Sequence, residues 1–168
     1  MSFITYPLAK KHKKDSFECE QPSLTRYLKE QASQDMKKKL ALCFVYADHE
    51  KNVEGYYTLS NDSIPKSQVP EEIQKKLGYP HIPVTLLGRL ARHQKLRGQG
   101  LGELLLLDAL KKSLEASLGH SASFAVVTDP IDGHAENFYR KFGFEKLEGS
   151  QRMFLPMKTV EDLFDDKK

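Results

Sequence analysis

The sequence of 168 residues has only two cysteines, Cys19 and Cys43, and no long apolar run. Neither cysteine has metal-ligand spacing, so we expect no metal site and interpret both as packing residues in a reducing compartment. No secretory leader follows Met1, and no apolar stretch is long enough to span a bilayer. These absences predict a cytoplasmic protein that does not interact with membranes, and the sequence also shows no internal repeat or low-complexity tract.

The length and composition are typical of one globular domain, with 39% hydrophobic and 29% charged residues. Residues 161–168 hold four acids and two bases, which leaves 24 bases and 19 acids, a net charge of +5, in residues 1–160. We therefore expect a single domain over 1–160 and an acidic C-terminal tail over 161–168. The densest basic clusters are Lys10, Lys11, Lys13 and Lys14, and then Lys37, Lys38 and Lys39. Such clusters usually form a solvated face, and a polyanionic partner is the alternative.

Apolar, β-prone runs alternate with segments of helical spacing along the chain. The runs predict strands over 3–8, 40–47, 53–60, 84–92, 123–128, 145–147 and 153–157. Helical spacing predicts helices from an N-cap at Ser23, after Pro70, over 101–118, and over 133–142 with Asp132 as the cap. Residues 34–39 form either a second helical turn or a loop, and the C-terminal residues are either frayed or a last helical turn.

Three glycines at alternate positions, Gly98, Gly100 and Gly102, lie where a strand-like segment gives way to a helical pattern. Because glycine lacks a Cβ atom, backbone N–H groups at such a turn can approach an anion closely. The dinucleotide-binding fingerprint is excluded because its third glycine would fall at Glu103. The P-loop is excluded because no Gly-Lys-Ser/Thr ending follows the glycines. The alternative is an ordinary turn that needs positive φ angles. Basic residues crowd the mouth of the turn, namely Arg92, His93, Lys95 and Arg97.

The stretch RGQGLG at 97–102 resembles the pyrophosphate-binding signature of the GNAT acetyltransferases. Downstream, ASFAVVTDP followed by GHAENFYRKFGF is similar to the second half of that family's pattern. The resemblance implies an α/β GNAT fold: a mixed, twisted sheet of six to seven strands, splayed between strands four and five and flanked by helices. It also implies that acetyl-CoA is the co-substrate and lies in the splay, with its pantetheine arm paired to the fourth strand.

The resemblance assigns acetyl-CoA binding to residues of the fourth strand, the glycine turn and the late helix. They are Leu90, Ala91, Arg92, Arg97, Gly98, Gln99, Gly100, Leu101, Gly102, Asn137 and Arg140. One backbone N–H group of 90–92 would serve as the oxyanion donor. Many members of the family have asparagine seven residues before the tyrosine of the late helix, where this chain has Asp132. We therefore do not transfer that asparagine contact.

Tyr139 is the residue that the resemblance places as the general acid for the departing thiolate. A phenol, with an unperturbed pKa of about 10, keeps its proton at neutral pH and can donate it. The alternative is a core aromatic residue on an amphipathic helix beside Phe138 and Phe142, and of these Phe138 fits the apolar role better.

No residue is clearly a general base. Glu136, His134 and Glu103 are candidates only by proximity in sequence, and each fits a helix-surface or capping role better. An α-amine has a pKa of about 7.7 to 8, against about 10.4 for lysine, so part of it is already neutral and water can carry the proton away.

Several stretches are similar to one branch of the family, the GNAT toxins of bacterial toxin–antitoxin pairs. They are FECEQPSLTRYLKEQA, GYYTLS, LGRLA leading into GQGLGELLL, and ENFYRKFGF. This likeness implies acetylation of the α-amine of aminoacyl-tRNA, inhibition by a ribbon-helix-helix antitoxin, and a homodimer. Arg92, Lys95, Arg140 and Lys141 would then contact phosphates of tRNA or of coenzyme A. Two alternatives remain: acetylation of a small amine or of a protein or peptide amine, and a non-catalytic module that binds acetyl-CoA.

Overall fold

A computed structural model describes residues 2–165 of the chain. The strands are β1 (Tyr6–Pro7), β2 (Leu42–Ala47), β3 (Val53–Pro65), β4 (His81–Arg92), β5 (Ala125–Thr128), β6 (Glu145–Lys146) and β7 (Met153–Pro156). The helices are α1 (Pro22–Glu30), α2 (Ala32–Lys37), α3 (Glu71–Gln74), α4 (Leu101–Ser117), α5 (Gly133–Arg140) and α6 (Met157–Phe164), with single 3-10 turns at Lys66–Gln68 and Gln94–Leu96.

The seven strands form one mixed sheet in the order β1-β2-β3-β4-β5-β7-β6. The β2–β3 hairpin is antiparallel, with Phe44 opposite Tyr57, and β5 is antiparallel to β7. β4 and β5 run parallel, and just before β5 the Phe124 N–H donates to the Pro83 carbonyl at 2.8 Å. These pairings confirm the predicted α/β class and the mixed sheet of six to seven strands.

Within the described residues the chain divides into two compact units. The first unit is drawn from Met1–Ser60 and Leu87–Lys112, and the second from Asn61–Leu86 and Ser113–Lys168. The expected single domain over 1–160 stays a prediction. The expected boundary at residue 160 falls inside α6, and residues 166–168 of the expected tail lie outside the described residues.

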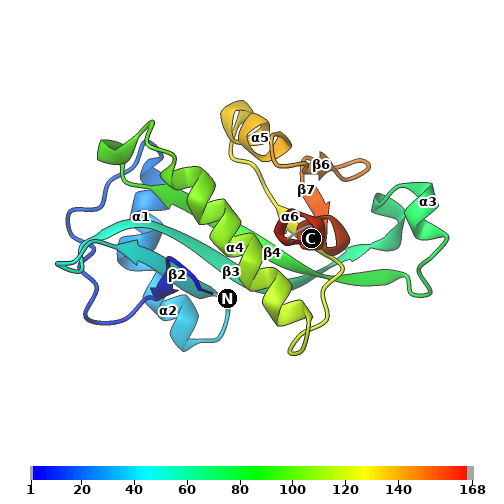
Figure 1. Cartoon of the computed structure of the whole chain (residues 1–168), viewed down its shortest axis with the longest axis horizontal. Helices are drawn as coiled ribbons and strands as arrows, with labels where there is room; N and C mark the ends of the chain where they lie inside the picture. The colour runs from blue at the N-terminus through cyan, green and yellow to red at the C-terminus, as the bar shows by residue number, and fades with distance from the viewer. Residues whose placement is uncertain (1, 166–168) are drawn as a thin grey trace. The chain divides into compact units, whose positions relative to one another are not determined.

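In the first unit, α1 and α4 cover opposite faces of β3 (Figure 1). Gly55 faces α4 so closely that a Cβ atom there would lie 2.8 Å from Cδ1 of Leu105. Its neighbour Tyr56 points the other way and donates its hydroxyl to the Leu24 carbonyl of α1 at 2.6 Å. The core of this unit is apolar and aromatic; it includes Phe17, Tyr27, Leu28, Cys43, Val45, Val53 and Ala91.

A buried carboxylate holds the start of the chain against α4. Asp108, only 4% exposed, accepts hydrogen bonds from the Ile4 N–H at 2.8 Å, the Thr5 hydroxyl at 2.6 Å and the Tyr57 hydroxyl at 2.7 Å. The ammonium of Lys112 lies 3.9 Å from the same carboxylate. The network fixes the segment before β1 to the helix that follows the glycine turn.

In the second unit, an ion-pair network joins the end of β5 to β3. Arg152 donates to both carboxylate oxygens of Asp129 at 2.8 and 2.9 Å, and to Asp62 at 3.0 Å. The core beneath it comprises Ile64, Val69, Ile82, Val84, Ala125, Val127, Leu147 and Phe154.

Two local predictions are wrong. Ser23 is not the N-cap of the first helix: Gln21 occupies that position and Pro22 opens the helix, where its missing N–H costs no hydrogen bond. The third strand does not end at Ser60 but continues to Pro65, so the segment expected to be an insert contains strand residues. Residues 34–39 belong mostly to a helix, α2, and the chain after β7 forms α6.

Candidate functional site

The glycine turn lies between β4 and α4 in the first unit. After Arg92 the chain makes the 3-10 turn Gln94–Leu96, passes through Gly98 and Gly100, and enters α4 at Leu101. Gly98 and Gly100 have φ angles of +80° and +81°, and a Cβ atom at either would meet nothing within 4 Å. Only glycine adopts this backbone without strain, and the open space beside it leaves the main chain accessible.

The turn leads into a helix long enough to provide an anion site at its N-terminus. α4 has 17 residues, and the first N–H groups of a helix have no partner within it. They also carry the positive end of the helix dipole. Gly98, Gly100, Leu101 and Gly102 therefore place main-chain donors where a diphosphate could bind, whereas the Gln99 N–H donates to the Leu96 carbonyl at 3.3 Å.

The basic residues at the mouth of the turn are not all free cations. Arg92 donates to both oxygens of Glu20 at 2.8 and 3.0 Å, and Nε of Arg97 lies 3.9 Å from the same carboxylate. The ammonium of Lys95 lies 3.4 Å from Glu54. The hydrogen bond from Arg92 is the main reason that the pKa of Glu20 is lowered. Glu20 is therefore an ionised partner of the turn, 72 residues from Arg92 in sequence.

The ring of His93 is held by a hydrogen-bond partner at each of its nitrogens. Its Nδ1 accepts from the Lys95 N–H at 3.2 Å, and its Nε2 lies 2.8 Å from the Ser16 carbonyl. Because an N–H must donate and a carbonyl must accept, Nδ1 acts as the acceptor and Nε2 as the donor in this arrangement. The ring also packs edge-on against Phe17, so His93 anchors the strand end to the N-terminal segment.

The other group of predicted site residues lies on α5, in the second unit. Asp132 caps the helix as predicted, because its Oδ1 accepts from the Ala135 N–H at 2.9 Å. Tyr139 is the buried aromatic residue of α5, only 7% exposed, and its ring packs edge-on against Phe138 and Phe144. The expectation that Phe138 fills the apolar role is wrong, since Phe138 is only half-buried.

Burial keeps Tyr139 protonated. Burial raises the pKa of the phenol, and a side-chain hydrogen bond with Thr128 lowers that pKa by a smaller amount. A phenol of this kind holds its proton over the physiological range, so a proton for a departing thiolate is always present.

The remaining candidates on α5 lie on its exposed side. Glu136 is bound by Arg140 at 2.8 Å and by Lys146 at 3.4 Å. These contacts, with the Arg140 hydrogen bond as the largest cause, lower the pKa of Glu136. A carboxylate stabilised in its ionised form is a weak base, which agrees with a surface role. His134 and Asn137 are exposed on the same helix.

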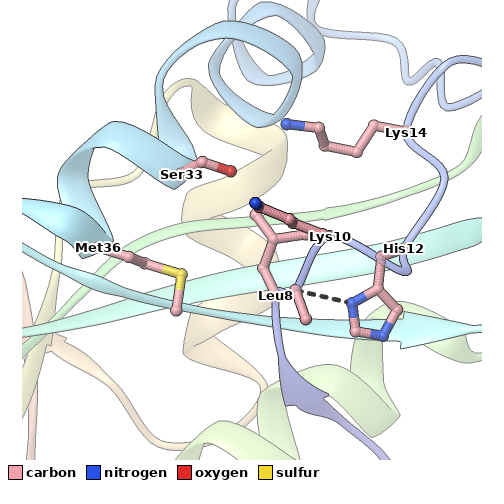
Figure 2. Close-up of a pocket in the computed structure, with 7 residues that line it drawn as sticks. Leu8, Lys10, His12, Lys14, Ser33 and Met36 are labelled. Carbon is pink, nitrogen blue, oxygen red and sulfur yellow. Dashed lines mark hydrogen bonds between the residues drawn. The ribbon is translucent and has the colours of Figure 1, made fainter.

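A pocket of about 390 Å³ opens elsewhere in the first unit, beside α2 (Figure 2). Its lining is apolar below and basic at the rim: Leu8, Ala9, Lys10, His12, Lys14, Ser33 and Met36. His12 is buried, its Nδ1 accepts from the Ala9 N–H at 2.9 Å, and burial together with nearby lysines lowers its pKa. Two lysines of the first basic cluster, Lys10 and Lys14, thus line this pocket, and none of the predicted site residues does.

The described residues also bear on whether the chain could hold a metal ion or cross a membrane. Over residues 2–165, no group of three or more histidine, cysteine, aspartate or glutamate side chains could hold a metal ion. Over the same part of the chain, no helix combines the length and the apolar character needed to cross a membrane.

Comparison with known proteins gives matches over most of the chain. Residues 39–146 match the model of the Acetyltransferase (GNAT) domain. A tRNA-acetylating toxin of Mycobacterium tuberculosis (strain ATCC 25618 / H37Rv) is 33% identical over 132 residues, which cover 77% of this chain and 76% of that protein.

Solved structures of similar proteins include three complexes of one toxin. AtaT complexed with acetyl-methionyl-tRNAfMet has a TM-score of 0.89 and 27% identity, covering 98% of this chain and 100% of that one. AtaTR bound with AcCoA has a TM-score of 0.84 and 28% identity, with coverage of 96% and 97%. A mutant AtaT toxin bound to the C-terminus of the antitoxin AtaR has a TM-score of 0.83 and 26% identity, with coverage of 96% and 98%.

Proposed function

Because the chain belongs to the GNAT acetyltransferase family, we propose that it transfers the acetyl group of acetyl-CoA to the α-amine of aminoacyl-tRNA and thereby blocks translation. The observation that carries this proposal is the similarity to a toxin complexed with an acetylated aminoacyl-tRNA, which extends over nearly the whole of both chains. The glycine turn and the buried tyrosine supply the two chemical functions that such a transfer needs.

In this proposal the main chain of the turn binds the diphosphate of acetyl-CoA. The open, left-handed glycines and the first N–H groups of α4 donate to it. Leu90, Ala91 and Arg92, at the end of β4, pair with the pantetheine arm, and one of their N–H groups polarises the thioester carbonyl. Arg97, with 75% of its side chain exposed, and Arg140 and Asn137 on α5 complete the binding residues.

Tyr139 supplies the proton for the leaving group. The neutral amine attacks the acetyl carbonyl, a C–N bond forms and the C–S bond breaks. The nitrogen, positively charged once the C–N bond has formed, loses one proton to water; the sulfur takes the phenol proton, and the phenolate regains a proton from solvent. The raised pKa of Tyr139 keeps the phenol protonated at neutral pH and also makes it a weaker acid than free tyrosine.

No described carboxylate near Tyr139 in sequence is suited to deprotonate the amine, since Glu136 is held ionised by two cations. We propose that the acceptor's α-amine, with its ordinary pKa of about 7.7 to 8, loses its proton to water. An acceptor with a lysine-like amine would need a dedicated base.

The proposed partners follow from the same comparison. An antitoxin is expected to bind this chain, as AtaR binds the AtaT toxin. A homodimer and a cytoplasmic location stay predictions, to be tested by light scattering and by fractionation.

A cell-free translation reaction tests the proposed function. Wild-type protein with acetyl-CoA should stop synthesis, wild-type protein with coenzyme A alone should not, and Tyr139→Phe should act far more slowly. Fresh charged tRNA added after removal of the enzyme should restore synthesis. Continued synthesis in the presence of wild-type protein and acetyl-CoA would contradict the proposal and favour a small-amine or protein substrate.

A further inference from the structure

Arg89 is a charged residue within the apolar middle of β4, and its guanidinium lies flat against an aromatic ring. Its Cζ atom is 3.7 Å from the centroid of Tyr27, on α1, and the side chain is half-buried. Tyr27 in turn stacks on Tyr56, with 6.3 Å between the ring centroids. One face of the guanidinium is therefore covered by a favourable cation–π contact, and the side chain is directed to the α1 face of the sheet.

The edge of the same guanidinium is unoccupied. Over residues 2–165, Arg89 has no carboxylate within 4 Å and donates no side-chain hydrogen bond, whereas Arg92 and Arg152 both bind carboxylates. Asp35, whose carboxylate interacts electrostatically with Arg89, already accepts from the Tyr27 hydroxyl at 2.7 Å and from Gln31 at 2.9 Å. Arg89 therefore has Asp35 as an electrostatic neighbour but no ion pair, and its five N–H donors form no hydrogen bond with the described residues, so they are left for a ligand.

The position of Arg89 in β4 limits which ligand this can be. It directly precedes Leu90, Ala91 and Arg92, the main-chain partners proposed for acetyl-CoA. The cofactor's diphosphate is proposed to bind at the start of α4, and α4 covers the face of the sheet opposite α1. The free edge of Arg89 thus lies beside the proposed thioester position, on the face covered by α1 rather than by α4.

We propose that Arg89 binds a phosphodiester group at the aminoacyl end of the RNA acceptor, and so selects nucleic-acid acceptors over free amines. This inference rests on the proposed function. The planar fork of arginine matches two phosphate oxygens at once, which lysine cannot do, and the Tyr27 ring holds the fork in one plane. Arg89 is then a substrate-binding residue that fixes where the α-amine lies.

The test compares two acceptors that carry the same aminoacyl ester: charged tRNA, and an aminoacyl-adenosine without phosphate. Arg89→Gln should lower kcat/KM for charged tRNA roughly ten- to hundredfold, as expected for one lost contact to a charged group, and leave kcat/KM for the nucleoside ester unchanged. Arg89→Lys keeps the charge and loses the fork, so it should show most of the same loss. Arg26→Gln, which removes an exposed charge one residue from Tyr27, is the matched control and should change neither value.

A second measurement needs no variant. The wild-type enzyme should acetylate an aminoacyl-adenosine that carries a 5′-phosphodiester more efficiently than one that lacks it. Equal use of the two, or an equal loss on both acceptors in Arg89→Gln, would overturn the proposal and assign Arg89 a structural role. Failure of the wild type on every aminoacyl acceptor would instead overturn the proposed function.

Discussion

Replacing Tyr139 with phenylalanine removes a single oxygen atom from the buried side of α5. The ring is only 7% exposed and packs edge-on against Phe138 and Phe144 at centroid distances of 5.2 and 5.3 Å. Phenylalanine fills the same space, so these contacts should survive. What is lost is the hydrogen bond with Thr128 and the proton intended for the leaving thiolate.

The two losses have different sizes. One buried hydrogen bond contributes about 1 kcal/mol to the free energy of unfolding, so Tyr139→Phe should stay folded. Loss of a general acid lowers kcat by about 10² to 10⁴. Because burial raises the pKa of Tyr139, the wild-type rate should show no alkaline decline caused by this residue below about pH 10.

Single-turnover acetylation of charged tRNA is the assay, with the thioester varied. A thioester whose thiol is more acidic than coenzyme A needs less proton donation, so the deficit of Tyr139→Phe should shrink with it. An unchanged kcat in Tyr139→Phe, or a deficit that is the same for both thioesters, would refute the assignment. The matched control is Phe138→Leu, which alters the same aromatic cluster and should change kcat little.

Three further predictions rest on single substitutions, in the glycine turn, in the Asp108 network and at the candidate bases of α5. Gly98→Ala, at φ +80°, should lower the free energy of unfolding by about 1 to 2 kcal/mol and weaken acetyl-CoA binding in calorimetry. The control Gly78→Ala, in open space without a positive φ, should leave acetyl-CoA binding unchanged. Equal affinity of Gly98→Ala and the wild type for acetyl-CoA would count against the turn as the binding site. Asp108→Ala leaves two buried hydroxyls, of Thr5 and Tyr57, and the part-buried Ile4 N–H without their acceptor, and it should cost about 3 to 5 kcal/mol in urea unfolding; a cost near zero would disprove the network. Glu136→Gln and His134→Ala should retain acetylation of charged tRNA, and a loss above roughly a hundredfold in either would reveal a dedicated base.

The fold was largely predictable because its strands are short apolar runs separated by clear turns. The alternation of strands and helices, the glycine turn and the Asp132 cap all depend on neighbours in sequence, and the structure confirms them. Ser23 failed as an N-cap because the preceding proline, Pro22, starts the helix, so the cap is Gln21, two residues earlier than predicted. β3 was predicted too short because its last residues are polar on the exposed side, while Ile64 is buried.

The candidate site was predictable only where it depends on the main chain. Positive φ angles at Gly98 and Gly100 follow from the residue type, but the pairing of Arg92 with Glu20 joins residues 72 positions apart. Periodicity also could not decide which of two adjacent aromatics, Phe138 or Tyr139, is buried. Arg89 was missed although a sign was present, since it is a charged residue inside an apolar strand.

The most direct test of the account is the chemical fate of the acceptor. Purified wild-type protein is incubated with acetyl-CoA carrying an isotopic label in the acetyl group, together with charged tRNA, uncharged tRNA and a panel of free amines, and the products are identified by mass spectrometry. We expect the label on the α-amine of the aminoacyl group of charged tRNA, and none on uncharged tRNA. Label on free amines or on protein, with charged tRNA unmodified, would contradict the account.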